Sequence, residues 1–243
     1  MILQIFFRYT EKLDLYYHPE LLEQVWHCSD LVHEYMFHNL TSLGVSQCNN
    51  LVHVIPSHLL PCFGNLEELN VTGCSAVKVI FNINDARETK ALGTFRLKKL
   101  FLDELPILEH VWNKDPEGNF CLQVLQEMSV LECDTLKYVF PASVAKDLTR
   151  LEMLRVTHCK ELVEIFSEDE IPAEGATKEL MFPSLTSLYI NKLPGLKYFY
   201  RGLHKIEWPL LKELYAYRCN LVILECQEDH PDEQALVPVE KVC

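Results

Sequence analysis

The chain has 243 residues, of which 49% are hydrophobic and 23% charged, a composition typical of a globular protein rather than a disordered or collagen-like one. Its formal net charge of −13 argues against nucleic acid as the main partner, because binding to the phosphate backbone depends on lysine and arginine. The same net charge predicts a partner with a basic surface.

Neither export nor membrane insertion is expected from the sequence. The ten cysteines include no CxxC pair, which favours reduced, buried thiols in a cytoplasmic protein, with the nucleus as an alternative location. Residues 1–7 are apolar but too few for the core of a signal peptide. Residues 35–66 contain no Asp, Glu, Lys or Arg, but Pro56 and Pro61 interrupt them, so we expect no transmembrane helix.

The predicted elements follow one another as copies of a leucine-rich phrase. The first copy, around Leu13, is degenerate. The second and third copies, which begin at Leu40 and Leu66, have the pattern Leu-x-x-Leu-x-Val-x-x-Cys. The fourth has Leu-Pro in place of the cysteine region, the fifth and sixth restore the cysteine, the seventh has Leu-Pro again, and the eighth is a shorter cysteine version. Because the Leu-Pro version recurs in every third coil, we infer duplication of a three-coil module.

The second apolar position of each copy marks the place of a strand. The eight markers lie 26 to 34 residues apart and are Leu13, Leu43, Leu69, Leu100, Met128, Leu154, Leu188 and Leu214. Apolar residues alternate around each marker, which predicts a short strand with one buried face. One coil cannot bury its leucines alone, so the strands should stack in parallel. We therefore predict an α/β leucine-rich-repeat solenoid with a parallel β-sheet on its concave face and loops and short helical turns on its convex face.

Other features are expected outside these strands. An aromatic residue stands three positions before the first leucine of four copies, and these side chains should stack along the convex side: Phe37, Phe63, Phe182 and Trp208. Residues 142–148 follow Pro141 and predict a short convex helix, with Ser143 as its start signal. Polar insertions at residues 82–94, 113–119 and 167–180 should form loops at the rims.

The same pattern divides the chain into three parts. Residues 1–10 are expected to be an N-terminal extension or a truncated repeat, and residues 11–226 a repeat domain of about eight coils. Residues 227–243 follow the last repeat and are predicted to form an acidic, disordered tail.

Several longer phrases carry a family resemblance. They occupy residues 105–113 (Leu-Pro-Ile-Leu-Glu-His-Val-Trp-Asn), 133–145, 159–166, 182–188 and 207–214. Together they resemble the C-terminal leucine-rich repeats of plant coiled-coil nucleotide-binding leucine-rich-repeat (NB-LRR) disease-resistance proteins. The resemblance implies a cytosolic receptor whose repeats restrain a nucleotide-binding module and help to perceive pathogen effectors or altered host proteins. The phosphate loop of that module does not occur in the sequence, so the chain is expected to be a fragment of a longer receptor or a truncated gene product.

Five cysteines occupy one equivalent position of the repeat: Cys48, Cys74, Cys133, Cys159 and Cys219. Neighbouring coils would bring pairs of them within the Cα separation that a disulfide permits, so a redox or metal site is one interpretation. The favoured interpretation is structural, because a small, weakly polar side chain suits the turn after a strand. The histidines show no zinc-binding spacing. We expect no metal, no cofactor and no catalytic residues, and hence no enzyme.

The best candidate for a binding site is the concave strand face. Aromatic and arginine side chains dominate interface hot spots, and the predicted partner-contacting residues are Phe101, Arg155, Tyr189, Tyr215 and Tyr217. In the alternative interpretation this is a solvated sheet face, on which tyrosines merely pair across strands.

The predicted function is protein recognition in plant defence. The partner would be a pathogen effector, a guarded host protein or the receptor's own nucleotide-binding domain, and neither nucleic acid nor a membrane. An alternative is substrate recognition for an F-box type ubiquitin ligase, whose repeats also contain cysteine. The uneven coil lengths make that alternative the less favoured one.

Overall fold

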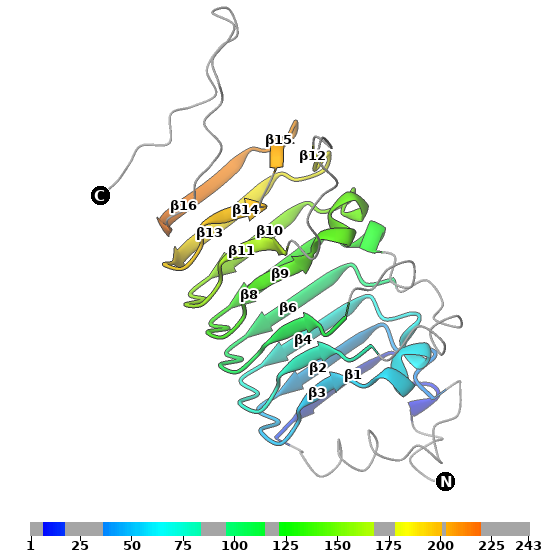
Figure 1. The fold of residues 1–243 in the computed structure, drawn as a ribbon. Coiled ribbons are helices and arrows are strands. Elements are labelled where there is room, and N and C mark those ends of the chain that lie inside the picture. The colour runs from blue at the N-terminus through cyan, green and yellow to red at the C-terminus, as the bar shows by residue number, and fades with distance from the viewer. Residues whose placement is uncertain are drawn as a thin grey trace, which may run out of the picture.

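The computed structural model of the chain describes residues 7–17, 36–83, 96–114, 122–167, 178–200 and 203–219. Eight parallel strands form one large sheet in chain order, and β1 and β16 lie at opposite ends of the stack (Figure 1). These strands are β1 (Lys12–Tyr16), β2 (Ser42–Ser46), β4 (Glu68–Thr72), β6 (Lys99–Asp103), β8 (Glu127–Leu131), β10 (Met153–Thr157), β13 (Ser187–Leu193) and β16 (Glu213–Cys219). The predicted leucine-rich-repeat solenoid is thus confirmed, and the large sheet has one strand for each marker.

The register of the large sheet follows the repeat alignment residue by residue. Leu13 pairs with Leu43, and the pairing continues through every marker to Leu214. In β6, Leu100 and Leu102 are buried, whereas the alternate residues are half-buried. This alternation puts one face of the sheet on the core and leaves the other, here called the open face, toward solvent.

The side opposite the large sheet contains short strands in addition to the expected loops and helical turns. Two three-stranded parallel sheets and one two-stranded sheet are present. Their strands are β3 (His53–Ile55), β5 (Val79–Phe81) and β7 (His110–Trp112); β9 (Tyr138–Pro141), β11 (Glu164–Ser167) and β14 (Tyr198–Tyr200); and β12 (Lys178–Met181) with β15 (Leu203–Glu207). Equivalent segments of successive coils run side by side, and pairing satisfies their backbone groups.

Helical structure is sparse in the described residues and includes three short 3-10 helices: η1 (Ser57–Phe63), η3 (Leu122–Val124) and η4 (Ala142–Asp147). The predicted convex helix is present as η4, but Pro141 and not Ser143 occupies its N-cap position. None of the described helices combines the length and the apolar character needed to cross a membrane.

The three predicted insertion loops fall largely outside the described residues, as does the predicted tail at residues 227–243. One part of the loop prediction is wrong. Lys178–Met181, at the end of the third insertion, forms strand β12 and pairs with β15.

Aromatic rings form a ladder inside the solenoid that runs from Phe81 to Phe166. The ring centroids of Phe81 and Trp112 lie 5.8 Å apart, those of Trp112 and Phe140 5.9 Å, and those of Phe140 and Phe166 5.2 Å. Phe37 and Phe63 stack at 4.8 Å, as predicted. They are completely buried, so the stack lies in the interior of the coils. Apolar rings gain more from the coil interior than from a solvated surface.

Phe182 and Trp208 do not stack on one another. Both contact Phe199 edge-on, with ring centroids 6.1 and 5.7 Å away. Phe182 is buried and Trp208 is half-buried against the core. The aromatic core therefore continues to the C-terminal end of the stack.

Every strand of the large sheet has the same tight turn at or near its end. The residue four positions after every marker has a φ between 50° and 63°. These eight residues, seven of which are not glycine, are Tyr17, Gln47, Gly73, Glu104, Glu132, His158, Lys192 and Arg218. In the first six, the N–H donates to the next coil, as in the 2.9 Å bond from Gln47 to the Thr72 carbonyl. These eight residues, here called the rim row, border the open face.

Candidate protein-interaction face

The open face consists of three parallel rows of side chains. The central row takes the residue directly after each marker, and strand pairing places these residues side by side: Asp14, Gly44, Asn70, Phe101, Ser129, Arg155, Tyr189 and Tyr215. Four of the five predicted contact residues belong to this row. The fifth, Tyr217, lies in the adjacent row, opposite Asn191.

Three of the predicted residues form one cluster at the C-terminal end of the central row. The guanidinium carbon of Arg155 lies 4.7 Å from the centroid of the Tyr189 ring. The rings of Tyr189 and Tyr215 are stacked, with centroids 4.9 Å apart and planes 7° from parallel. The rings therefore pair across strands, as the alternative interpretation expected, and they also offer a continuous surface for a partner.

A carboxylate holds this cluster in position. The hydroxyl groups of Tyr189 and Ser187 both donate hydrogen bonds to Glu213 Oε2. The bond to Glu213 raises the pKa of Tyr189. The same two hydrogen bonds, with that of Tyr189 the stronger influence, lower the pKa of Glu213. A ring fixed in this way loses less conformational entropy when a partner binds.

The other two predicted residues are placed differently. Phe101 is half-buried on β6, and the small side chain of Ser129 separates it from Arg155. Tyr217 is 44% exposed, and the guanidinium carbon of Arg218 lies 5.2 Å from its ring centroid. Tyr215 is 59% exposed. The structure thus places all five residues on the open face, and their contact with a partner stays a prediction.

Sequence reasoning missed the charged residues of the rim row. Glu104 and Glu132 are acidic in the middle of the stack, whereas Lys192 and Arg218 are basic at its C-terminal end. Burial, reinforced by Glu104 and Glu132, raises the pKa of Asp103. The sequence feature that could have identified these residues is their fixed position, four residues after each marker.

The ladder cysteines support the turns rather than a reactive site. All six cysteines that the structure describes are thiols and not disulfides. In four coils the thiol lies 3.2–3.5 Å from the carbonyl oxygen two residues earlier, where it can donate a hydrogen bond: Cys48, Cys74, Cys133 and Cys159. The described part of the chain contains no group of three or more His, Cys, Asp or Glu residues arranged to hold a metal ion. These contacts favour the structural interpretation of the ladder.

These buried thiols predict a loss of stability at alkaline pH. Burial raises the pKa of Cys159 from 9.0 to about 12 and raises that of Cys133 well above its usual value. The unfolded chain therefore releases these protons at lower pH than the folded chain, so their contribution to stability is lost as pH rises from 9 to 12. Urea midpoints measured between pH 8 and 11 should fall less steeply for Cys159→Ser than for the wild type. An equal slope would contradict this prediction.

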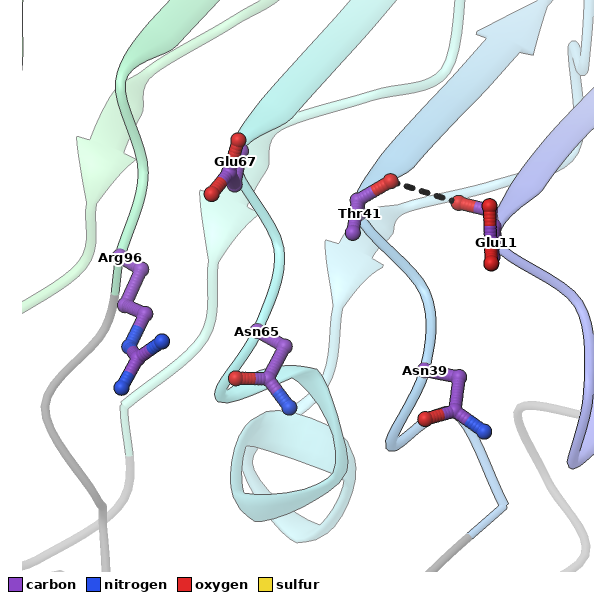
Figure 2. Close-up of a pocket in the computed structure, with 6 residues that line it drawn as sticks. All are labelled: Glu11, Asn39, Thr41, Asn65, Glu67 and Arg96. Carbon is purple, nitrogen blue, oxygen red and sulfur yellow. Dashed lines mark hydrogen bonds between the residues drawn. The ribbon is translucent and has the colours of Figure 1, made fainter.

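A shallow hollow of about 280 Å³ lies beside the residues that precede the first strands of the large sheet, at the strand ends opposite the rim row. Figure 2 shows its two rows of lining residues: Asn39, Asn65 and Arg96 in one, and Glu11, Thr41 and Glu67 in the other. The side-chain amides of Asn39 and Asn65 donate to carbonyls of the preceding coils at 2.8 and 2.7 Å. These amides already make hydrogen bonds from one coil to the next, so the hollow is best explained as a structural feature of the repeats rather than as a ligand-binding site.

Comparison with known proteins identifies similar repeats. Residues 9–160 match the family model described as plant disease resistance protein RPS2-like, leucine-rich repeats. The chain is also 27% identical over 174 residues to the provisionally named disease resistance protein At4g19050 of Arabidopsis thaliana. That alignment covers 70% of this chain but 13% of the relative. Tyr189, Tyr215 and Tyr217 lie beyond the segment that matches the family model.

Proposed function

Because the chain belongs to the RPS2-like leucine-rich-repeat family of plant disease resistance proteins, we propose that it is the protein-recognition module of a plant intracellular immune receptor. Leucine-rich-repeat solenoids of this family are protein-interaction modules, and the family supports a role in defence. We propose further that the open face senses a pathogen effector or a guarded host protein and helps to restrain a nucleotide-binding domain. The chain spans 13% of the length of its Arabidopsis relative. Its role within a complete receptor is therefore also a proposal.

The observation that carries the proposal is the cluster of Arg155, Tyr189 and Tyr215. Its rings are stacked and held by Glu213, while Tyr215 remains 59% exposed. Exposed, rigid aromatic and arginine side chains are the groups that most often dominate protein interfaces. The F-box alternative is not favoured, because the family match is to disease resistance proteins. A non-catalytic role in the cytoplasm, with the nucleus as an alternative, is part of the same proposal.

The test is a binding assay with the double change Tyr189→Ala and Tyr215→Ala. Candidate effectors, guarded host proteins and a nucleotide-binding domain of the family would be assayed pairwise with the purified chain. For the partner that binds, the double variant should lower the affinity by about tenfold to a hundredfold, because two packed rings are removed from the interface.

The matched control is Tyr9→Ala, which removes a tyrosine that is 74% exposed but lies outside the open face. This variant should bind like the wild type, and circular dichroism should show the same fold for all three proteins. Unchanged binding by the double variant would show that the open face is not the recognition surface.

A further inference from the structure

The rim row changes sign along the stack. Its residues are Glu104 and Glu132 in the coils of β6 and β8, His158 in the coil of β10, and Lys192 and Arg218 in the last two coils. All five share one left-handed backbone conformation and therefore occupy equivalent places. The border of the open face is acidic in the middle of the stack and basic at its C-terminal end.

The cations at the basic end have no carboxylate partner among the described residues. These are Arg155, Lys192 and Arg218, of which the two arginines contact tyrosine rings instead. Several lysines of earlier coils are paired, such as Lys98 with Glu67, Lys99 with Glu127 and Lys160 with Asp134, at N–O distances of 2.6–2.9 Å. Carboxylates are abundant in a chain of net charge −13, so three cations without one at the same end of the open face leave that end open to an external anion.

Two further features of the basic end suit a peptide. Tyr215 and Tyr217 present exposed ring faces, and strand pairing places Asn191 beside Tyr217. Asn191 Oδ1 is buried and has no hydrogen-bond donor among the described residues. A buried acceptor without a donor is destabilising, so a rotation of the Asn191 side chain that brings this oxygen to the N–H of a bound peptide would be favourable.

Among the described residues, the one carboxylate beside these cations on the open face is already engaged. Glu213 accepts hydrogen bonds from Tyr189 and Ser187 in the first part of β16. Arg218 lies five residues further along the chain, at the rim. The stack of Tyr189 and Tyr215 is thus stabilised by Glu213 without neutralisation of the rim cations.

We propose that the surface formed by Arg155, Asn191, Lys192, Tyr215, Tyr217 and Arg218 binds an acidic peptide segment of the partner protein. This inference rests on the proposed function, since it assigns a chemistry to the partner of the open face. Carboxylates of the segment pair with the three cations, and its backbone lies against the tyrosine rings. Glu104 and Glu132 would repel any part of the segment that reached the coils of β6 and β8, which confines it to the C-terminal end.

This inference reverses the expectation, drawn from net charge, of a basic partner. Physiological salt screens charges beyond about 8 Å, whereas β8 and β13 are two strand spacings, or about 10 Å, apart. A bound segment therefore responds to the local cations more than to the total charge of the chain. The electrostatic contribution of distant carboxylates is weak at this distance.

The test uses two fluorescein-labelled fourteen-residue peptides, one of alternating Glu and Ser and one of alternating Lys and Ser. Fluorescence anisotropy would measure their binding to the full chain at low and physiological salt. The acidic peptide should bind and the basic peptide should not bind at this surface. Arg155→Gln with Arg218→Gln should raise the dissociation constant of the acidic peptide by about tenfold or more, because two charge-assisted contacts are lost.

The matched control is Lys98→Gln with Lys160→Gln, which changes the net charge equally but removes cations that are already paired. It should alter the dissociation constant by less than about threefold. Absence of acidic-peptide binding, tighter binding of the basic peptide, or equal weakening by both double variants would overturn the proposal. If Tyr189→Ala with Tyr215→Ala abolishes binding of a partner but the arginine double variant does not, the acidic chemistry is wrong and the proposed function stands. If neither variant affects that partner, the open face itself is wrong.

Discussion

Replacing Phe140 by alanine is expected to lower the free energy of unfolding by about 3–5 kcal/mol. Phe140 is completely buried and lies in the aromatic ladder between Trp112 and Phe166, with ring centroids 5.9 and 5.2 Å away. Its removal leaves a cavity that the two neighbouring coils cannot fill, because the paired strands β9 and β11 fix their backbones. Urea denaturation followed by circular dichroism and by Trp fluorescence would measure the change.

The control for this prediction is Tyr198→Ala. Tyr198 is also an aromatic residue on the side of the coil opposite the large sheet, but it is 37% exposed. Its removal should cost less than about 1 kcal/mol. Similar losses for the two variants would show that the ladder is not the main source of cohesion between coils.

The second large effect is expected along the marker row of the large sheet. Leu154 and Leu214 occupy equivalent positions of the repeat, but Leu154 is 1% exposed and Leu214 is 37% exposed. Leu154→Ala should lower the free energy of unfolding by about 3–4 kcal/mol, as for other fully buried leucines. Leu214→Ala should cost about 1 kcal/mol, because part of its side chain meets water on β16, the last strand of the sheet.

The same denaturation experiment compares both leucine variants directly. Both variants replace leucine by alanine at equivalent positions of the repeat. The difference between their losses of free energy of unfolding therefore reports the burial supplied by a following coil. Equal losses would show that Leu214 is covered as well as Leu154 is.

Much of the large sheet could be predicted from the sequence because its signal repeats. The spacing of Leu13, Leu43 and the later markers matches the strand register without a shift. A strand with one buried face must alternate apolar and polar residues, so five residues suffice to reveal it. Repetition at eight places then removes the ambiguity that one short segment would have.

The strands on the side opposite the large sheet could not be predicted in the same way. β3, β5 and β7 have three residues each, too few to show a period. Val79, Ile80 and Phe81 are all buried, so no alternation is present in β5. These segments are strands only because equivalent segments of the neighbouring coils lie beside them.

Burial of the aromatic residues and local charge were also decided by the tertiary structure. The sequence marks Phe37 and Phe63 as equivalent and predicts that they stack, but only the structure shows that both are completely buried. The net charge of −13 describes the whole chain, whereas Arg155, Lys192 and Arg218 share one end of the open face only after the strands are in register. The electrostatic energy of a bound partner depends on its distances to the individual charges of the folded protein, and not on the net charge alone.

The sequence by itself determined the leucine-rich-repeat class, the strand register and the residues that could face a partner, because each depends on a period that the chain repeats. The tertiary structure decided that the convex side contains sheets, that Arg155, Tyr189 and Tyr215 form one cluster, and that the open face is basic at its C-terminal end. Each of these depends on contacts between residues of different coils, about 30 residues apart in the chain, and such contacts exist only once the coils are stacked.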